Sequence, residues 1–320
     1  MNIEFILIVL GEPNSVFSEI IGKYFKKNKY GNKKIVIIGN KNLLINQLKT
    51  LKYSILVNQI DDLKYAKKKK INIINVNYNY KKTFSKITKN SASYIERCFD
   101  LCLKILKKNS KNTVLINGPV SKKSYLKNKY SGITEYLSKK TGSANEVMLI
   151  YNNKLSVSPL TTHIPIKKVT KSINKKKIIN NILKIHKFYR KTLRKPVRFA
   201  VLGLNPHCET TDKFNEDEKI ILPAIKILKK KEISISGPFS ADTFFLKENL
   251  KNFDVVLGMY HDQVLTPIKT IYRFNAINIT LGLPFIRISP DHGPNLSMVG
   301  KNLSDPSSFD YAMKFIQKLK

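Results

Sequence analysis

Short apolar runs, each about the length of a β-strand, recur along the whole chain. They occupy residues 3–10, 34–38, 54–57, 113–116, 147–150, 198–202, 254–257 and 276–280. Segments with apolar residues at helical spacing lie between them; in residues 178–189, for example, positions 178, 182, 185 and 189 are apolar. Strands that alternate with helices predict an α/β fold with a largely parallel sheet.

The length of the chain, 320 residues, allows a large core and predicts two domains or lobes. The run at residues 3–10 is too short to span a bilayer, and it lacks the basic leader and cleavage site of a signal peptide. We therefore expect a buried first strand and a cytoplasmic protein.

Three cysteines, an odd and sparse set, argue against a disulfide framework. Cys98 and Cys102 lie one helical turn apart in an amphipathic segment, so we expect both to face the core. Cys208 follows a histidine directly, but we do not expect it to be a metal ligand.

The net charge of +36 invites a nucleic-acid interpretation, but only six of the 58 basic residues are arginine. Arginine is the residue preferred for forked contacts to phosphates and bases. The lysines are spread through the chain, which favours a solvated surface of biased composition. We expect the positive field to attract anionic substrates, without specific binding of nucleic acid or membrane.

Glycine spacing excludes two common cofactor motifs. No two glycines are separated by a single residue, so the chain lacks the dinucleotide-binding fingerprint, and no Gly-x-x-x-x-Gly-Lys stretch of a Walker phosphate loop occurs either. A nucleotide cofactor would need another architecture.

Three of the five histidines, His163, His207 and His261, follow apolar runs at points where the chain leaves a predicted strand. Three neutral imidazoles can bind one divalent metal ion and leave a position open for substrate. A single histidine after a strand is more often structural, so the pattern alone leaves both interpretations open.

Other polar residues mark the same kind of position. Arg287 lies in an otherwise apolar strand, and a buried arginine requires either an internal ion pair or an anionic ligand such as a phosphate. Thr134 enters a predicted helix, where it is either a cap or an anion ligand. Lys122 and Asp242 lie in turns that follow predicted strands.

Six motifs occur in order, and together they are specific. They lie at residues 117–122, 161–165, 203–207, 237–243, 259–263 and 278–293. On these motifs the chain resembles the 4-hydroxythreonine-4-phosphate dehydrogenase family of vitamin B6 synthesis, over nearly its whole length. The resemblance implies an isocitrate/isopropylmalate-dehydrogenase-like fold, with two α/β lobes and an active-site cleft between them. It also implies a homodimer with a shared active site.

The resemblance suggests approximate lobe boundaries, with residues 1–120 plus 266–320 in an outer lobe and residues 121–265 in a central lobe that makes the dimer contacts. It implies three groups of site residues. The metal ligands would be His163, His207 and His261, and the residues that bind the phosphorylated substrate would be Thr134, Lys269, Asn278 and Arg287. Asp291, His292 and Gly293 would contact NAD or NADP, and Asp242 and Lys122 are candidates for proton transfer. One divalent metal ion per site is expected, either zinc, magnesium or cobalt, and Asp262 is a candidate to orient His261.

The chain departs from the family pattern in three places. The first loop has Glu12 where the family has aspartate, and Ile133 stands where the family has a substrate-binding histidine. Residues 208–213 replace a glycine-rich stretch. These changes spare the three histidines, but they bear on the exact substrate.

We therefore expect metal-assisted, NAD(P)-dependent oxidation and decarboxylation of 4-hydroxythreonine 4-phosphate to 3-amino-2-oxopropyl phosphate. An alternative is a sister dehydrogenase that acts on a phosphorylated sugar acid such as 4-phosphothreonate or 4-phosphoerythronate. A more remote alternative is a non-catalytic nucleic-acid-binding protein, which would have no use for the three histidines.

Overall fold

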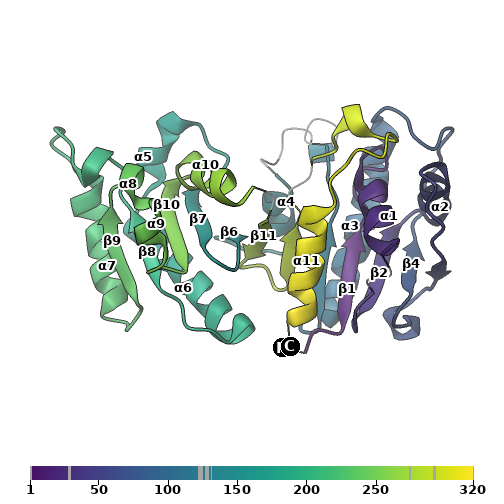
Figure 1. Ribbon diagram of the computed structural model, residues 1–320, viewed down its shortest axis with the longest axis horizontal. Coiled ribbons are helices and arrows are strands. Elements are labelled where there is room, and N and C mark those ends of the chain that lie inside the picture. The colour runs from purple at the N-terminus through teal and green to yellow at the C-terminus, as the bar shows by residue number, and fades with distance from the viewer. Residues whose placement is uncertain are drawn as a thin grey trace. The chain divides into compact units, whose positions relative to one another are not determined.

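The computed structural model describes residues 2–27, 30–121, 125–126, 130, 132–273, 275–290 and 293–319. The chain forms two compact units, and each is an α/β structure (Figure 1). Unit 1 comprises Met1–Gly142 and Leu283–Lys320, and unit 2 comprises Ser143–Gly282. No helix in the described residues combines the length and apolar character needed to cross a membrane.

Unit 1 contains a sheet of parallel strands in the order β3-β4-β2-β1-β5-β12. Its strands are β1 (Phe5–Val9), β2 (Lys34–Gly39), β3 (Val57–Gln59), β4 (Ile71–Asn75), β5 (Thr113–Asn117) and β12 (Ile286–Ser289). Its helices are α1 (Phe17–Phe25), α2 (Lys41–Thr50), α3 (Lys89–Asn109), α4 (Ile133–Lys140) and α11 (Ser307–Lys318).

Helices lie on both faces of this sheet, with α1 and α11 on the near face and α3 on the far face in Figure 1. Strand β1 is buried on both sides, as its continuous apolar run requires. Leu7 and Val9 pack in one cluster with Cys98 and Cys102 of α3. Both cysteines are buried and unbridged, which confirms the sequence prediction.

Unit 2 contains a mixed sheet in the order β11-β6-β7-β10-β8-β9. Its strands are β6 (Val147–Tyr151), β7 (Ser156–Thr161), β8 (Phe199–Leu202), β9 (Ile235–Phe239), β10 (Val255–Tyr260) and β11 (Ile277–Leu281). Its helices are α5 (Val169–Ser172), α6 (Lys175–Phe188), α7 (Leu222–Lys229), α8 (Ala241–Phe244), α9 (Lys247–Leu250) and α10 (His261–Tyr272). Strand β6 runs antiparallel to both of its neighbours, while β7, β10, β8 and β9 are mutually parallel.

The two units divide later in the chain than the approximate boundaries at 120/121 and 265/266 suggested by the sequence. Helix α4 stays with unit 1 because Tyr136 and Leu137 pack into the core around α3. Strand β11 stays with unit 2 because it pairs with β6 from Ile277 to Leu281. Packing and pairing, which join distant parts of the chain, therefore set these boundaries.

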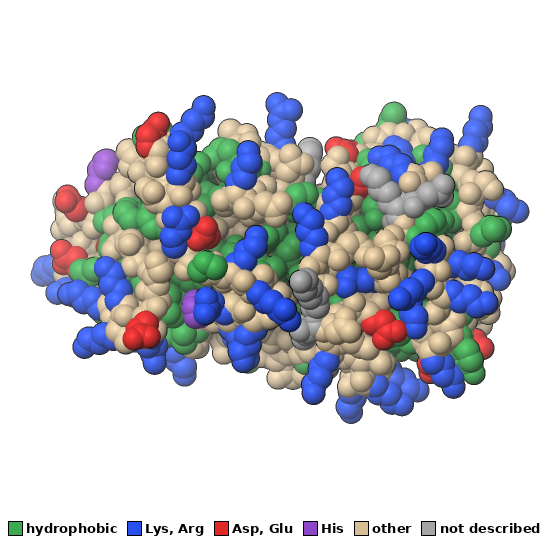
Figure 2. Space-filling model, turned by 60° about the horizontal axis from the view of Figure 1, so that its bottom comes forward, with side chains coloured by type: hydrophobic (Ala, Val, Ile, Leu, Met, Phe, Trp, Pro, Cys, Tyr) green, Lys and Arg blue, Asp and Glu red, His purple; other side chains and the backbone are tan. Residues whose placement is uncertain are grey.

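The basic side chains do not gather in one stripe on the face shown in Figure 2, where lysines and arginines are scattered among apolar and neutral surface. The lysine run at residues 67–70 is exposed, as the sequence predicted. This distribution agrees with a solvated surface of biased composition.

Candidate functional site

The three histidine-bearing turns of unit 2 follow neighbouring strands. Strands β7, β10 and β8 are adjacent and parallel, so their carboxyl ends lie at the same edge of the sheet. His163 follows the end of β7 by two residues, His261 begins α10 directly after β10, and His207 lies in the turn Pro206–Cys208 after β8. Three turns that are far apart in the sequence thus lie at the same edge of the sheet, the carboxyl-terminal edge of its parallel strands. This is where α/β proteins commonly bind ligands.

His163 and His261 lie close together, with ring centroids 5.9 Å apart. An imidazole nitrogen about 2.1 Å from a zinc ion leaves its ring centroid about 3.2 Å from the ion, so two tetrahedral ligands have centroids about 5.3 Å apart. The observed spacing is close to this value, and the donor set of this pair therefore fits a divalent metal ion.

The carboxylate of Asp262 orients one of these rings. Its Oδ1 lies 2.7 Å from Nδ1 of His261, as the sequence suggested. A carboxylate in this position favours the tautomer that carries the proton on Nδ1, and this leaves the lone pair of Nε2 for a metal ion.

His207 occupies a left-handed backbone position, with a φ of 55°. Within the described residues of one chain, no three His, Cys, Asp or Glu side chains come close enough together to hold a metal ion. The neighbouring Cys208 is an unfavourable extra ligand because burial, followed by the nearby Asp217 charge, raises the pKa of its thiol. His207 as the third ligand remains a prediction.

Asp242 lies at the start of α8, where Ser240 Oγ donates a hydrogen bond of 2.5 Å to its Oδ1. That bond is the main cause of a lowered pKa for Asp242, and the charge of His207 contributes further. The side chain is exposed and ionised at neutral pH, which suits a proton acceptor better than a proton donor. The other candidate for proton transfer, Lys122, lies outside the described residues.

Arg287 and Thr134 meet inside unit 1. Arg287 is only 1% exposed, and its Nη1 donates to Thr134 Oγ1 over 2.9 Å. Its Nε donates to Asn117 Oδ1 over 2.8 Å. Burial lowers the pKa of Arg287 to about 10, and the carboxylate of Glu135 acts in the opposite direction. Asn117 and Thr134 are neutral acceptors, so the negative charge that favours the ionised guanidinium comes from Glu135.

Lys269 and Asn278, the other two predicted substrate ligands, belong to unit 2. Lys269 is exposed in the last turn of α10. Asn278 lies in β11 opposite Ile150, and its buried Oδ1 makes no hydrogen bond to any part of the chain that the structure describes. An unpaired buried amide atom is costly unless a water molecule or a ligand group pairs with it.

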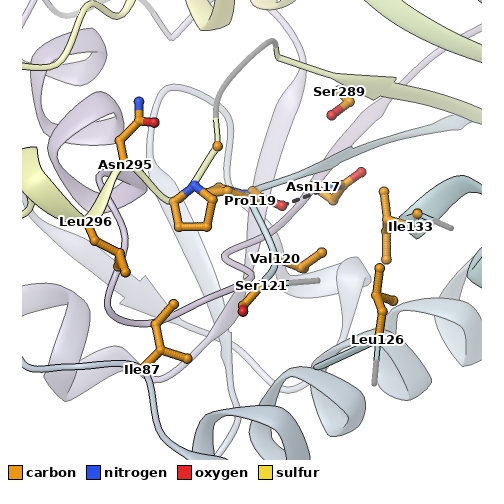
Figure 3. Close-up of a pocket in the computed structure, with 14 residues that line it drawn as sticks. Ile87, Asn117, Pro119, Val120, Ser121, Leu126, Ile133, Ser289, Asn295 and Leu296 are labelled. Carbon is orange, nitrogen blue, oxygen red and sulfur yellow. Dashed lines mark hydrogen bonds between the residues drawn. The ribbon is translucent and has the colours of Figure 1, made fainter. Parts of the chain in front are cut away.

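A cavity of about 490 Å³ opens in unit 1 near the carboxyl ends of β5 and β12. Figure 3 shows Ile87 and Leu296 on one side of it and Leu126 and Ile133 on the other. Gly293 also lines the cavity, and among the described residues a Cβ atom built there would meet only Asn295 Oδ1, at 3.5 Å. Internal packing therefore does not require a glycine at this position. Asp291 and His292, the other predicted cofactor contacts, lie outside the described residues.

Two residues of the site, Asn117 and Gln263, lie in the sequence motifs at residues 117–122 and 259–263, but the sequence predicted no role for them. Asn117 accepts the hydrogen bond from Arg287, and Gln263 connects the ends of β8 and β10. For Asn117 the available signal was a polar residue at the last position of a buried strand. For Gln263 no local signal exists, because its two partners lie on different strands.

The family described as "Pyridoxal phosphate biosynthetic protein PdxA" matches residues 31–316. A 4-hydroxythreonine-4-phosphate dehydrogenase of Sulfurihydrogenibium sp. (strain YO3AOP1) is 37% identical over 322 residues, which cover 98% of this chain and 97% of that protein. The solved structure of a 4-hydroxythreonine-4-phosphate dehydrogenase from Klebsiella pneumoniae has a TM-score of 0.82 at 25% identity, covering 97% of this chain and 99% of the other. A β-decarboxylating dehydrogenase from Thermococcus kodakarensis shares the fold alone, with a TM-score of 0.51 at 10% identity and coverage of 98% and 83%.

Proposed function

The chain belongs to the pyridoxal phosphate biosynthetic protein PdxA family, and we propose that it oxidises 4-hydroxythreonine 4-phosphate with NAD or NADP. The oxidised intermediate is a β-keto acid, which loses CO2 to give 3-amino-2-oxopropyl phosphate. We propose a cytoplasmic location for this reaction.

We propose that His163, His207 and His261 hold one divalent metal ion, either zinc, magnesium or cobalt. When bound, such an ion lowers the pKa of the substrate hydroxyl and stabilises the negative charge that develops on decarboxylation. The close pair of His163 and His261, together with the contact of Asp262, supports this assignment. The ionised carboxylate of Asp242, near His207, is the proposed acceptor of the hydroxyl proton.

Four residues are proposed to bind the substrate phosphate and its neighbouring polar groups: Thr134, Lys269, Asn278 and Arg287. Arg287 supports this role because its guanidinium is buried and its Nε and Nη1 are held in place by hydrogen bonds to Asn117 and Thr134. Asn278 supports it through its unpaired amide oxygen, since a rotation of the amide would present a donor instead.

The cavity of unit 1 is the proposed site for the adenosine side of NAD or NADP. Its lining includes Gly293, which follows the predicted contacts Asp291 and His292. The cavity combines apolar walls from Ile87 and Leu296 with a few polar groups, as adenine sites commonly do. NAD and NADP remain alternatives.

A homodimer with shared metal ligands is part of the proposal. Among the described residues of one chain, the rings of His163 and His261 are closely spaced, and these two do not form a three-ligand group with His207. A second subunit would bring the missing ligand to the pair. Dilution to monomers should therefore abolish turnover while leaving each unit folded around its own core.

Ile133 favours a second candidate function. It lines the cavity at the start of α4, where the resemblance implies a substrate-binding histidine. An isoleucine cannot donate a hydrogen bond, so the preferred substrate could instead be a phosphorylated sugar acid such as 4-phosphothreonate or 4-phosphoerythronate.

The observation that carries the proposal is the common edge from which the three histidine turns emerge. The test is to incubate the purified protein with NAD, a divalent metal ion and 4-hydroxythreonine 4-phosphate, and to identify the products by mass spectrometry. The proposal predicts 3-amino-2-oxopropyl phosphate and CO2. Turnover of a phosphorylated sugar acid in place of this substrate would establish the second candidate.

A further inference from the structure

A set of side-chain hydrogen bonds joins the strand ends that carry the three histidines. Thr161, the last residue of β7, is 2% exposed, and its Oγ1 donates to the backbone oxygen of Met259 in β10 over 2.7 Å. Gln263 makes two further bonds with its amide. Its Oε1 accepts from the backbone nitrogen of Met259, and its Nε2 donates to the backbone oxygen of Gly203 after β8, each over 2.7 Å.

Gln263 thereby links two of the histidine turns. It lies two residues after His261, on the first turn of α10, and its partner Gly203 lies four residues before His207. Only an amide side chain of this length can offer a donor to one strand end and an acceptor to the other. Gly203 has no space for a side chain, since a Cβ atom would come within 2.6 Å of Cys208 Sγ.

The His207 turn is also held from the other side. Asp217 is 1% exposed, and its carboxylate accepts hydrogen bonds from the backbone nitrogens of Leu204 and Asn205, at 2.8 and 3.1 Å. The segment that leads to His207 is therefore fixed at Gly203 by Gln263 and at the next two residues by Asp217.

We propose that Gln263 is a positioning residue for the metal site, one that sets the spacing between the His207 and His261 turns. This inference rests on the proposed metal-binding function. Gln263 would not contact the metal ion itself. Without its amide, the ends of β8 and β10 lose their direct side-chain link, and His207 and His261 of one chain are no longer held in the relative positions from which they enter the metal sites that the proposed dimer shares.

A matched control is available in the same unit. Asn152 also bridges two segments with a buried amide, since its Nδ2 donates to the backbone oxygen of Asn275 and its Oδ1 accepts from the backbone nitrogen of Lys154. It follows β6, which is antiparallel to β7, so it lies at the opposite edge of the sheet from Thr161. Losing this bridge should weaken the fold without reaching the histidines.

The experiment compares the full-length wild type, Gln263→Met and Asn152→Leu. Cobalt(II) affinity is measured from visible absorption in competition with a chelator, and the melting temperature is measured without metal. We expect both variants to melt at lower temperature than the wild type. Gln263→Met alone should lose about 10- to 100-fold in cobalt affinity, whereas Asn152→Leu should stay within about twofold of the wild type.

The possible failures are distinguishable. Wild-type cobalt affinity in Gln263→Met, or an equal loss in Asn152→Leu, would overturn the positioning role and leave the proposed metal site intact. A wild type that binds no divalent metal would overturn both. If Gln263→Met does not fold, Gln263→Glu replaces it, because its carboxylate still accepts from the Met259 nitrogen. Weaker cobalt binding by Gln263→Glu, despite the added negative charge, would support the inference, and equal or tighter binding would contradict it.

Discussion

The guanidinium of Arg287 donates to the hydroxyl of Thr134 over 2.9 Å in the interior of unit 1. These residues are 153 positions apart, and the sequence suggested both as ligands of the same phosphate. The bond means that Thr134 is already oriented by the arginine before any ligand arrives. A preorganised donor set costs less to order on binding, which is the condition for tight recognition of a small anion.

Arg287→Lys tests this arrangement. A lysine keeps the charge but cannot reach Asn117 and Thr134 with the same fork. We expect KM for the phosphorylated substrate to rise about 10-fold or more, and the free energy of unfolding to fall by about 1–3 kcal/mol, because buried acceptors lose their donors. Steady-state kinetics and denaturant unfolding measure the two effects. An unchanged KM in a folded variant would remove Arg287 from the phosphate site.

Ile133→His tests the departure from the family pattern. The imidazole would add a donor at the start of α4, beside the cavity that Ile133 lines. We expect KM for 4-hydroxythreonine 4-phosphate to fall by about 2- to 10-fold, the value of one added hydrogen bond. Ile133→Leu serves as the control and should leave KM unchanged. No gain in the histidine variant would mean that another group already fills this role.

Gly293→Ala tests the cofactor pocket. Since Asn295 Oδ1, at 3.5 Å, is the one contact that the new methyl group would make in the described part of the chain, the substitution should leave stability unchanged or slightly increased. Inside an occupied pocket, the same methyl group should crowd the dinucleotide and raise its KM severalfold. Thermal unfolding measures the effect on stability, and NAD titration measures the effect on the KM for the dinucleotide. A wild-type KM for both NAD and NADP would show that neither dinucleotide approaches Gly293.

Glu12→Gln tests the altered first loop by its pH dependence. Glu12 is 1% exposed, and burial raises its pKa from the ordinary value of 4.5, against the opposing effects of Asn14 and Ser91. A raised carboxyl pKa means that ionisation is harder in the folded state than in the unfolded state. Ionisation of Glu12 therefore lowers the free energy of unfolding above pH 4.5 and has no effect on it well below pH 4.5.

The glutamine variant should accordingly be more stable than the wild type at pH 7, and its advantage should disappear as the pH falls through 4.5. The glutamine can keep the contact of Glu12 with Ser91. Ser91 Oγ also donates to the backbone oxygen of Thr88, so it can accept a hydrogen bond from the glutamine amide. Glu248 is exposed, so Glu248→Gln is the control and should change stability little at either pH. A glutamine variant that is less stable at pH 7 would contradict this account.

The sequence predicted most strands because buried strands consist of continuous apolar runs, but β4 (Ile71–Asn75) was not among the predicted runs. The strand predicted at residues 54–57 was misplaced, because β3 begins only at Val57, where pairing with Ile71 starts. Leu56, inside the predicted run, is 93% exposed. Pairing with a strand further along the chain, rather than the hydropathy of the run itself, decides where this element begins.

The site was predictable where a residue type reveals its role locally. The histidines after strands and the arginine within an apolar strand are signals of this kind. The hydrogen bonds of Gln263 and the orienting bond from Arg287 to Asn117 were not, because each joins elements far apart in the sequence. Strand order determines these contacts, and periodicity within one segment carries no information about strand order.

The central claim is that this chain is a metal-assisted, NAD(P)-dependent dehydrogenase of 4-hydroxythreonine 4-phosphate. The most direct measurement is NAD reduction by the purified protein with this substrate, first with a divalent metal ion, then after removal of the metal with a chelator, and then after the metal is restored. The account predicts NADH formation that the chelator abolishes and the metal restores, with no recovery in His163→Ala. Undiminished NADH formation after complete metal removal, or no NADH with NAD or NADP under any metal condition, would contradict it.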